Sequence, residues 1–181
     1  MKNKTLPILL KNPQILLIGG GKVALQKAEV LHENEIDFKV ISDVCLEEIY
    51  ALCSDIELKK FEISDVQNFS TVVDATGNKE VTDALLLYKM EHSLLLNVVD
   101  VPALCDFYFM ALTRNRPLQI AVSSNGSSPT AAKYFRDECE ALIPKDIGEY
   151  LKNKKQERDA GIINIQETKK ELNNLNNGRN L

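Results

Sequence analysis

Histidines and closely spaced cysteines are scarce in this chain, which has two histidines and four cysteines among 181 residues. No two cysteines form a C-x-x-C pair, and no histidine stands near a cysteine in the sequence. Structural zinc sites are usually built from ligands only a few residues apart, so the spacing argues against such a site. We expect the cysteines to be reduced thiols.

The chain also lacks an excess of positive charge and a long apolar run. Its net charge of −4 at pH 7 gives no electrostatic case for nucleic-acid binding, which favours a basic surface. The apolar stretch near the start is broken by Lys11, Asn12 and Pro13, without a small-residue cleavage site after it. The next run, ILLI, is far shorter than the ~20 residues that span a bilayer. These features predict a cytoplasmic protein that binds neither nucleic acid nor membranes.

What the sequence does contain is an alternation of short apolar runs and amphipathic stretches from residue 14 to residue 100. The segments VALQKAEVLHENE, CLEEIYALCS and KEVTDALLLYKMEH have helical periods, and the predicted strands are QILLIG, DFKVISD, IELKKFEI, STVVDAT and SLLLNVVD. Such alternation predicts a parallel sheet covered on both faces. Beyond residue 100 we expect a strand over LQIAVSS, a helix over TAAKYFRDECEALIP, and a charged helical tail whose asparagine-rich end, from residue 171, frays.

Gly19, Gly21 and Ala24 form a G-x-G-x-x-A pattern between the first predicted strand and the helix after it. In a dinucleotide-binding turn the first glycine permits the tight turn, and the second lets the backbone approach the pyrophosphate. The alanine then lets the helix pack on the strand. Free N–H groups at the helix start face the phosphates. The alternative interpretation is an ordinary strand-to-helix turn.

Two further strand ends fit a dinucleotide. Asp43 ends the next predicted strand, about twenty residues after the glycines, where a carboxylate binds the ribose hydroxyls and repels a 2′-phosphate. This favours NAD over NADP, although a solvated loop acid would give the same pattern. The turn Ala75-Thr76-Gly77 follows the fourth strand and is expected under the nicotinamide half, unless it is an ordinary turn.

Asp100 ends the strand within LNVVDVP, at the sheet edge where ligands of open α/β sheets bind. It is a candidate general acid or base, and the alternative is an aspartate that caps the strand end. In AVSSNGSSP, Ser124 and Ser128 precede a helix, where hydroxyls either bind an anion or cap the helix, and the two roles are compatible. Tyr150 and Lys154 have the Y-x-x-x-K spacing of short-chain dehydrogenases, which we interpret as coincidence on a charged tail.

Four segments together, ILLIGGGKVALQKAEVL, VVDATGN, NVVDVP and AVSSNGSSPTAAKYFR, resemble the N-terminal module of siroheme synthase, which also exists as a free-standing precorrin-2 dehydrogenase. The resemblance covers roughly residues 6–150. It implies an α/β fold with a Rossmann-type, NAD-binding parallel sheet in residues 1–112 and a dimerisation and substrate-pocket region in residues 113–144. A small helical C-terminal segment with a frayed end then fills residues 145–181. An intertwined homodimer is also implied.

The activity that the resemblance implies is NAD-dependent conversion of precorrin-2 to sirohydrochlorin, and some members also insert ferrous iron to give siroheme. Asp100 would be the catalytic carboxylate, which takes the proton that leaves together with the hydride. The cofactor contacts carry over, beside Gly19, to Gly21, Lys22, Val23, Asp43, Val44 and Thr76. The substrate is a polycarboxylate, for which the expected contacts are Ser124, Ser128 and the cations Arg114, Arg116, Lys133 and Arg136.

Two other functions fit parts of the same sequence. A regulatory NAD-binding module, similar to the nucleotide-sensing domains of ion-transport systems, would use the glycines and Asp43 equally well. A diverged ferrochelatase or tetrapyrrole carrier without dehydrogenase activity would keep the tetrapyrrole contacts. Asp100 and the serine-rich segment discriminate the enzyme from the sensor, because a sensor needs neither.

Overall fold

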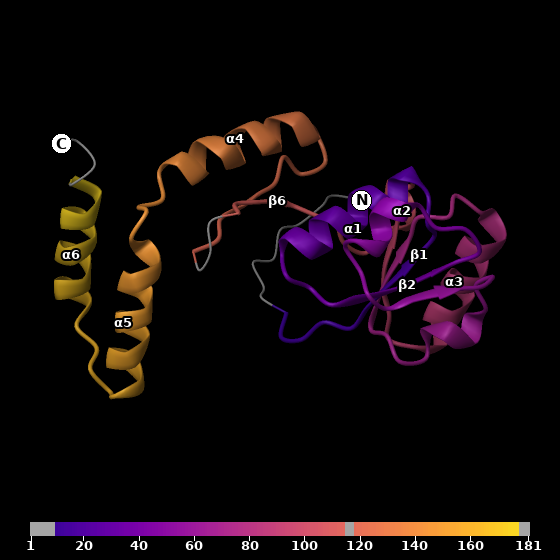
Figure 1. The fold of residues 1–181 in the computed structure, drawn as a ribbon, viewed down its shortest axis with the longest axis horizontal. Coiled ribbons are helices and arrows are strands. Elements are labelled where there is room, and N and C mark those ends of the chain that lie inside the picture. The colour runs from indigo at the N-terminus through magenta and orange to yellow at the C-terminus, as the bar shows by residue number, and fades with distance from the viewer. Residues whose placement is uncertain (1–9, 115–117, 178–181) are drawn as a thin grey trace. The chain divides into compact units, whose positions relative to one another are not determined.

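The computed structural model describes residues 10–114 and 118–177. Within these residues the chain divides into two compact units between Phe109 and Met110 (Figure 1). The first unit comprises residues 10–109 and the second unit comprises residues 110–177. The finer boundaries at residues 112 and 144 remain predictions.

The first unit is built on a five-stranded parallel sheet with the strand order β3-β2-β1-β4-β5. The strands are β1 (Ile15–Ile18), β2 (Phe38–Ser42), β3 (Ile56–Leu58), β4 (Thr71–Asp74) and β5 (Leu95–Val98). The order reverses at β1, which pairs with β2 on one side and β4 on the other. This is the predicted Rossmann-type α/β fold, and ligands of such sheets bind beyond the carboxyl ends of the strands at the reversal.

Both faces of this sheet are covered, as the continuous apolar strands predicted. Because neighbouring strand residues point to opposite faces, Leu17 and Leu16 of β1 enter different cores. The first core lies under α1 (Lys22–Glu33) and the second under α3 (Lys79–Glu91). Each fully buried leucine contributes about 1.5–3 kcal/mol to folding, so these two cores fix the strand ends that carry the candidate site.

The helical and strand predictions next to β3 were too long. The predicted helix over residues 45–54 is the single turn α2 (Glu47–Tyr50), and the predicted strand over residues 56–63 ends at Leu58. Glu62 and Asp65 form a reciprocal capping box that starts a 3-10 turn, η1 (Ile63–Val66), and this local hydrogen bonding replaces further strand pairing.

The second unit contains a short antiparallel pair, β6 (Ala111–Leu112) and β7 (Ala121–Val122), followed by three helices. The helices are α4 (Pro129–Ala141), α5 (Ile147–Asp159) and α6 (Ile165–Asn177). The strand predicted over residues 118–124 is therefore only two residues long. Helix α4 packs on the strand pair, where the Arg136 guanidinium donates a hydrogen bond to the Leu112 carbonyl over 3.4 Å.

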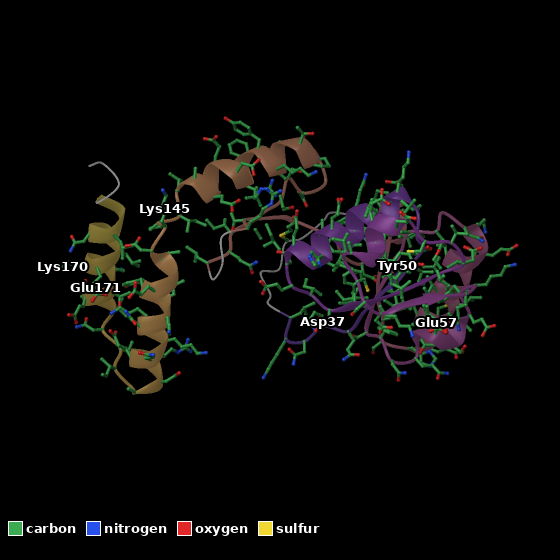
Figure 2. The ribbon with its side chains drawn as sticks, viewed as in Figure 1. Asp37, Tyr50, Glu57, Lys145, Lys170 and Glu171 are labelled. Carbon is green, nitrogen blue, oxygen red and sulfur yellow. The ribbon has the colours of Figure 1, made fainter. Side chains whose placement is uncertain are left out.

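Helix α6 is continuous through Asn177 and so includes the start of the asparagine-rich segment. The fraying expected from residue 171 stays a prediction. Glu171 lies on α6 (Figure 2). Two side chains of α5 bind it: the Lys154 ammonium at 2.7 Å and the Tyr150 hydroxyl at 3.2 Å. These contacts join α6 to α5 at Glu171, the first residue of the asparagine-rich segment.

The described residues contain free cysteines and no membrane-spanning helix. The cysteines Cys45, Cys53, Cys105 and Cys139 are free thiols. Among the helices of the described residues, none is long and apolar enough to cross a membrane.

Candidate functional site

The glycine turn after β1 is shaped by contacts with two neighbouring turns. Gly19 has a φ of +111°, and a Cβ atom there would lie 2.9 Å from the Ala75 carbonyl oxygen. A Cβ atom on Gly20 would lie 2.2 Å from the Val44 carbonyl oxygen. Both positions therefore need glycine for close backbone packing. Gly20 was not predicted as a site residue, because the G-x-G-x-x-A pattern leaves that position open.

Gly21 differs from its neighbours because its side faces open space. No described atom lies within 4 Å of the position that a Cβ atom would take on Gly21. Gly21 is the N-cap of α1, it makes no side-chain cap, and the first turn contains no acidic residue. The first N–H groups of α1 are thus left for an anion. Lys22 is exposed at the same end and Val23 is half-buried. This arrangement fits the pyrophosphate of a dinucleotide.

The turn after β2 brings Asp43 and Val44 beside the glycines. The Leu46 N–H donates to the Gly20 carbonyl over 2.9 Å, and the Ser42 hydroxyl donates to the Val44 carbonyl over 2.7 Å. Asp43 is exposed, and the Val44 side chain is 75% exposed. An exposed carboxylate and an exposed apolar side chain at this place are compatible with a ribose and an adenine, and the cofactor roles of Asp43 and Val44 stay predictions.

The turn after β4 is organised by Asp74, a buried carboxylate that the sequence analysis did not single out. Asp74 is 1% exposed and accepts three hydrogen bonds. The Thr76 N–H donates over 3.0 Å, the Thr76 hydroxyl over 2.6 Å and the Thr82 hydroxyl over 2.6 Å. Thr76 therefore sits in the predicted turn with its hydroxyl proton already engaged. The available signal was an acid at the end of an apolar strand, with threonines two and eight residues later.

The turn after β5 holds Asp100 in a strained conformation. Its φ is +65°, in the left-handed region that non-glycine residues rarely occupy, and the Val101 N–H closes the turn onto the Val98 carbonyl over 3.2 Å. Such outliers cost of order 1–3 kcal/mol and cluster at functional sites. Asp100 is exposed at the carboxyl edge of the sheet that also carries the glycine turn.

The segment that follows Asp100 is anchored to β5 by the buried Asn97 and by the Asp106 carboxylate. Asn97 is 5% exposed and donates through Nδ2 to the Phe107 carbonyl over 2.9 Å. The Leu96 N–H donates to the Asp106 carboxylate over 2.8 Å, and Lys89 forms an ion pair with the same carboxylate. The Asn97 Oδ1 atom has no hydrogen-bond partner among the described residues.

Lys27 of α1 is within electrostatic range of Asp100, and its sequence pattern marked it only as a helix residue. Its ammonium is 4.8 Å from the centre of the Phe109 ring. Burial lowers the pKa of Lys27, an effect that the negative charges of Asp100 and the Cys105 thiolate oppose. The signal in the sequence was a lysine on the apolar face of an amphipathic helix.

The predicted substrate contacts that are described lie in the second unit. The Ser128 N–H donates to the Ser124 hydroxyl over 2.9 Å, and the Ser128 hydroxyl caps α4 by accepting from the Ala131 N–H over 3.1 Å. The helix-capping interpretation is thus confirmed for Ser128. Arg136 pairs with Asp137 at 2.6 Å and lowers the pKa of that carboxyl group.

The other predicted cations have different surroundings. The Arg114 N–H donates to the Glu140 carboxylate over 2.9 Å, and Lys133 is exposed on α4. Arg116 lies outside the described residues. Ser124 and Ser128 therefore lie in contact with each other. Arg136 is instead bound to the Leu112 carbonyl and to Asp137.

Comparisons with known proteins agree with this geometry. Residues 6–111 match the family model described as "Putative NAD(P)-binding", and residues 115–142 match the model described as "Sirohaem biosynthesis protein central". Siroheme synthase of Ectopseudomonas mendocina is 33% identical over 152 residues, which cover 83% of this chain and 33% of that protein. Siroheme synthase of Methylococcus capsulatus is 34% identical over 149 residues, which cover 79% of this chain and 31% of that protein. The chain thus spans about a third of the length of these curated relatives.

A solved structure shares the fold. The structure named "SirC, precorrin-2 dehydrogenase" superposes with a TM-score of 0.68 at 21% identity, over 83% of this chain and 76% of that chain. The reversed parallel sheet and the glycine turn define an α/β protein of the Rossmann, dinucleotide-binding class. Within that class, the chain belongs to the family of siroheme synthase N-terminal NAD-binding modules and precorrin-2 dehydrogenases.

Proposed function

We propose that this chain is an NAD-dependent precorrin-2 dehydrogenase, which converts precorrin-2 to sirohydrochlorin in siroheme biosynthesis. The observation that carries the proposal is the shared edge of one parallel sheet. The glycine turn after β1 and the strained Asp100 after β5 both lie at the carboxyl end of that sheet. A dehydrogenation removes a hydride and a proton from the substrate. A dinucleotide bound at the glycine turn can accept the hydride, and a carboxylate on the same sheet edge can accept the proton.

The cofactor contacts follow from the three turns. NAD, when bound, supplies the hydride acceptor. The first N–H groups of α1, with Gly19, Gly21, Lys22 and Val23, bind the pyrophosphate. Asp43 binds the ribose hydroxyls and disfavours a 2′-phosphate, Val44 packs beside the adenine, and Thr76 borders the nicotinamide half.

Asp100 acts as the general base of the reaction. Its carboxylate accepts the proton that the substrate loses together with the hydride. The left-handed turn that holds Asp100 is closed on β5, so the carboxylate is carried by a rigid strand end rather than by a long loop. The proposed substrate contacts Ser124, Ser128 and Arg136 belong to the second unit.

We also propose that the protein acts as a homodimer in the cytoplasm. The support comes from α4 and the turn after it, where the large apolar side chains Tyr134, Phe135 and Leu142 are 59%, 58% and 69% exposed. A stable protein does not usually leave such a cluster in water, and a second copy would cover it. Light scattering of the purified protein tests this, and a strictly monomeric particle would contradict it.

The decisive experiment mixes the protein with precorrin-2 and either NAD or NADP and follows reduced-cofactor absorbance. We expect turnover with NAD and little with NADP. Nucleotide binding without turnover would instead favour a regulatory module. Siroheme formation that needs ferrous iron, measured in the same sample, tests chelation, and chelation without dehydrogenation would favour the diverged chelatase.

A further inference from the structure

Lys27 lies on a part of α1 where a lysine is unusual. Ala24, Ala28 and Leu31, which surround it on the helix, are all 0% exposed and pack on the sheet. The Lys27 side chain is itself half-buried beside them. A helix that packs against a sheet normally turns its charged residues toward water. The position of Lys27 therefore requires an explanation beyond solubility.

The Lys27 ammonium also lacks a partner of its own. Among the described residues, it has no carboxylate within the 4.0 Å of an ion pair and no hydrogen-bond acceptor. Its contacts are the Phe109 ring and the longer-range charge of Asp100. Burial lowers its pKa, which expresses the cost of keeping this charge out of water. A partly desolvated cation with unused N–H donors is suited to an incoming anion.

The support beneath this cation is built from partly buried aromatic rings. Phe109 contacts Phe107, with ring centres 5.6 Å apart, and both pack on the core under α1. The hydrogen bond from Asn97 to the Phe107 carbonyl ties that segment to β5. The ring under Lys27 and strand β5, which precedes Asp100, thus belong to one packed assembly.

We propose that Lys27 binds a carboxylate of the tetrapyrrole substrate and so positions that substrate against Asp100. This inference rests on the proposed function, because it takes the substrate to be a polycarboxylate. A phosphate of the cofactor would offer the same anionic oxygen. The helix geometry favours the substrate, since Lys27 lies about 7.5 Å along α1 from Lys22, where the phosphates are expected.

The test compares three variants with the wild-type protein. Lys27→Gln removes the charge, Lys27→Arg keeps it, and Lys60→Gln removes an exposed charge after β3, the edge strand opposite to β5. Each protein is titrated with NAD and, separately, with sirohydrochlorin, which carries the substrate's carboxylates. The KM for precorrin-2 and the melting temperature are also measured. We expect K27Q to weaken tetrapyrrole binding and raise the KM by about tenfold or more, as for a lost charge-assisted hydrogen bond. NAD affinity stays unchanged, K27R retains most of the binding, and K60Q behaves like the wild type.

Each other outcome has a definite meaning. Unchanged tetrapyrrole affinity in K27Q, with normal turnover in the wild type, overturns the inference and leaves the proposed function intact. Loss of NAD affinity alone assigns the cation to a cofactor phosphate and also overturns it. Binding that depends on Lys27 without any turnover supports the inference and refutes the dehydrogenase. A wild-type protein that neither binds nor converts the tetrapyrrole refutes both. If K27Q fails to fold, the same titrations of Lys27→Met decide.

Discussion

Lys27 in the first unit and Lys154 in the second unit both hold an ammonium over an aromatic ring, but in opposite electrostatic surroundings. Lys154 lies 5.6 Å from the centre of the Tyr150 ring and pairs with Glu157 at 2.8 Å and Glu171 at 2.7 Å. Its pKa is raised by these carboxylates, whereas the pKa of Lys27 is lowered by burial. The charge of Lys154 is therefore neutralised by carboxylates of the fold, whereas the charge of Lys27 is available to bind a ligand.

This contrast also explains the Y-x-x-x-K spacing of Tyr150 and Lys154. Both side chains are directed at Glu171, and the Tyr150 hydroxyl also donates to the Thr168 carbonyl over 3.3 Å. A catalytic pair would need its polar atoms free for a substrate. The spacing in this chain therefore serves the packing of α5 on α6, which agrees with its interpretation as coincidence.

The largest effect on activity is expected at Asp100, whose left-handed backbone conformation costs stability and is explained by its proposed catalytic role. Asp100→Asn should lower the turnover of precorrin-2 by about 100-fold or more, because the general base is lost. NAD affinity should not change, since Asp100 follows β5 and the cofactor turns follow β1, β2 and β4. Asp100→Gly is the matched variant: it should be equally inactive but more stable by about 1 kcal/mol, because glycine tolerates a φ of +65°. Full activity in Asp100→Asn would refute the assigned role.

The next effect concerns two neighbouring glycines with different surroundings. Gly20→Ala should destabilise the protein by about 1–3 kcal/mol, because its Cβ atom would meet backbone atoms of Val44 and Cys45 at 2.2 and 2.7 Å. Gly21→Ala should leave the melting temperature nearly unchanged, because that Cβ atom meets open space. It should nevertheless weaken NAD binding by occupying the space meant for the pyrophosphate. Equal melting temperatures for the two variants would contradict this difference.

These glycines show how far the sequence alone could reach. The order of strands and helices, the sheet class and the positions of Gly19, Gly21, Asp43 and Asp100 follow from local patterns, because periodicity and turn residues are encoded close together. The need for glycine at position 20 comes from Val44, on a different strand end, and no local pattern reports such a contact.

The remaining misses have the same physical origin. Asp74 accepts hydrogen bonds from threonine hydroxyls that approach it only in the folded turn between β4 and α3. The local sequence therefore looks like that of an ordinary strand end. Fraying of the tail was inferred from composition, and composition did not report the ion pair that Lys154 of α5 forms with Glu171. Tertiary contacts, rather than weak propensities, decide each of these positions.

A smaller effect on stability should distinguish Lys154, which is paired with carboxylates, from Lys27, which is not. Glu171→Gln should lower the stability of the α5–α6 pair, because Lys154 loses one of its two carboxylate partners. The pKa of Glu171 is lowered from 4.5 by the Lys154 ammonium. Its stabilising contribution is therefore present above about pH 4.5 and is lost as the pH falls through the lowered pKa. Hydrogen exchange of the α6 amides should show this pH dependence in the wild type and not in Glu171→Gln.

The smallest effect tests whether the charge of Lys27 destabilises or stabilises the folded protein. Because the pKa of Lys27 is lowered from 10.5 in the folded protein, the unfolded chain binds more protons between the two values, and stability rises with pH across that window. Lys27→Met, which keeps an apolar stem, should be at least as stable as the wild type at pH 7, and its advantage should shrink as the pH approaches 10.5. Cys105, whose pKa burial raises, titrates nearby, but it is present in both proteins and largely cancels in their difference. A Lys27→Met protein that is less stable than the wild type at pH 7, with the difference shrinking as the pH rises above 10.5, would mean that the ammonium stabilises the fold as Lys154 does.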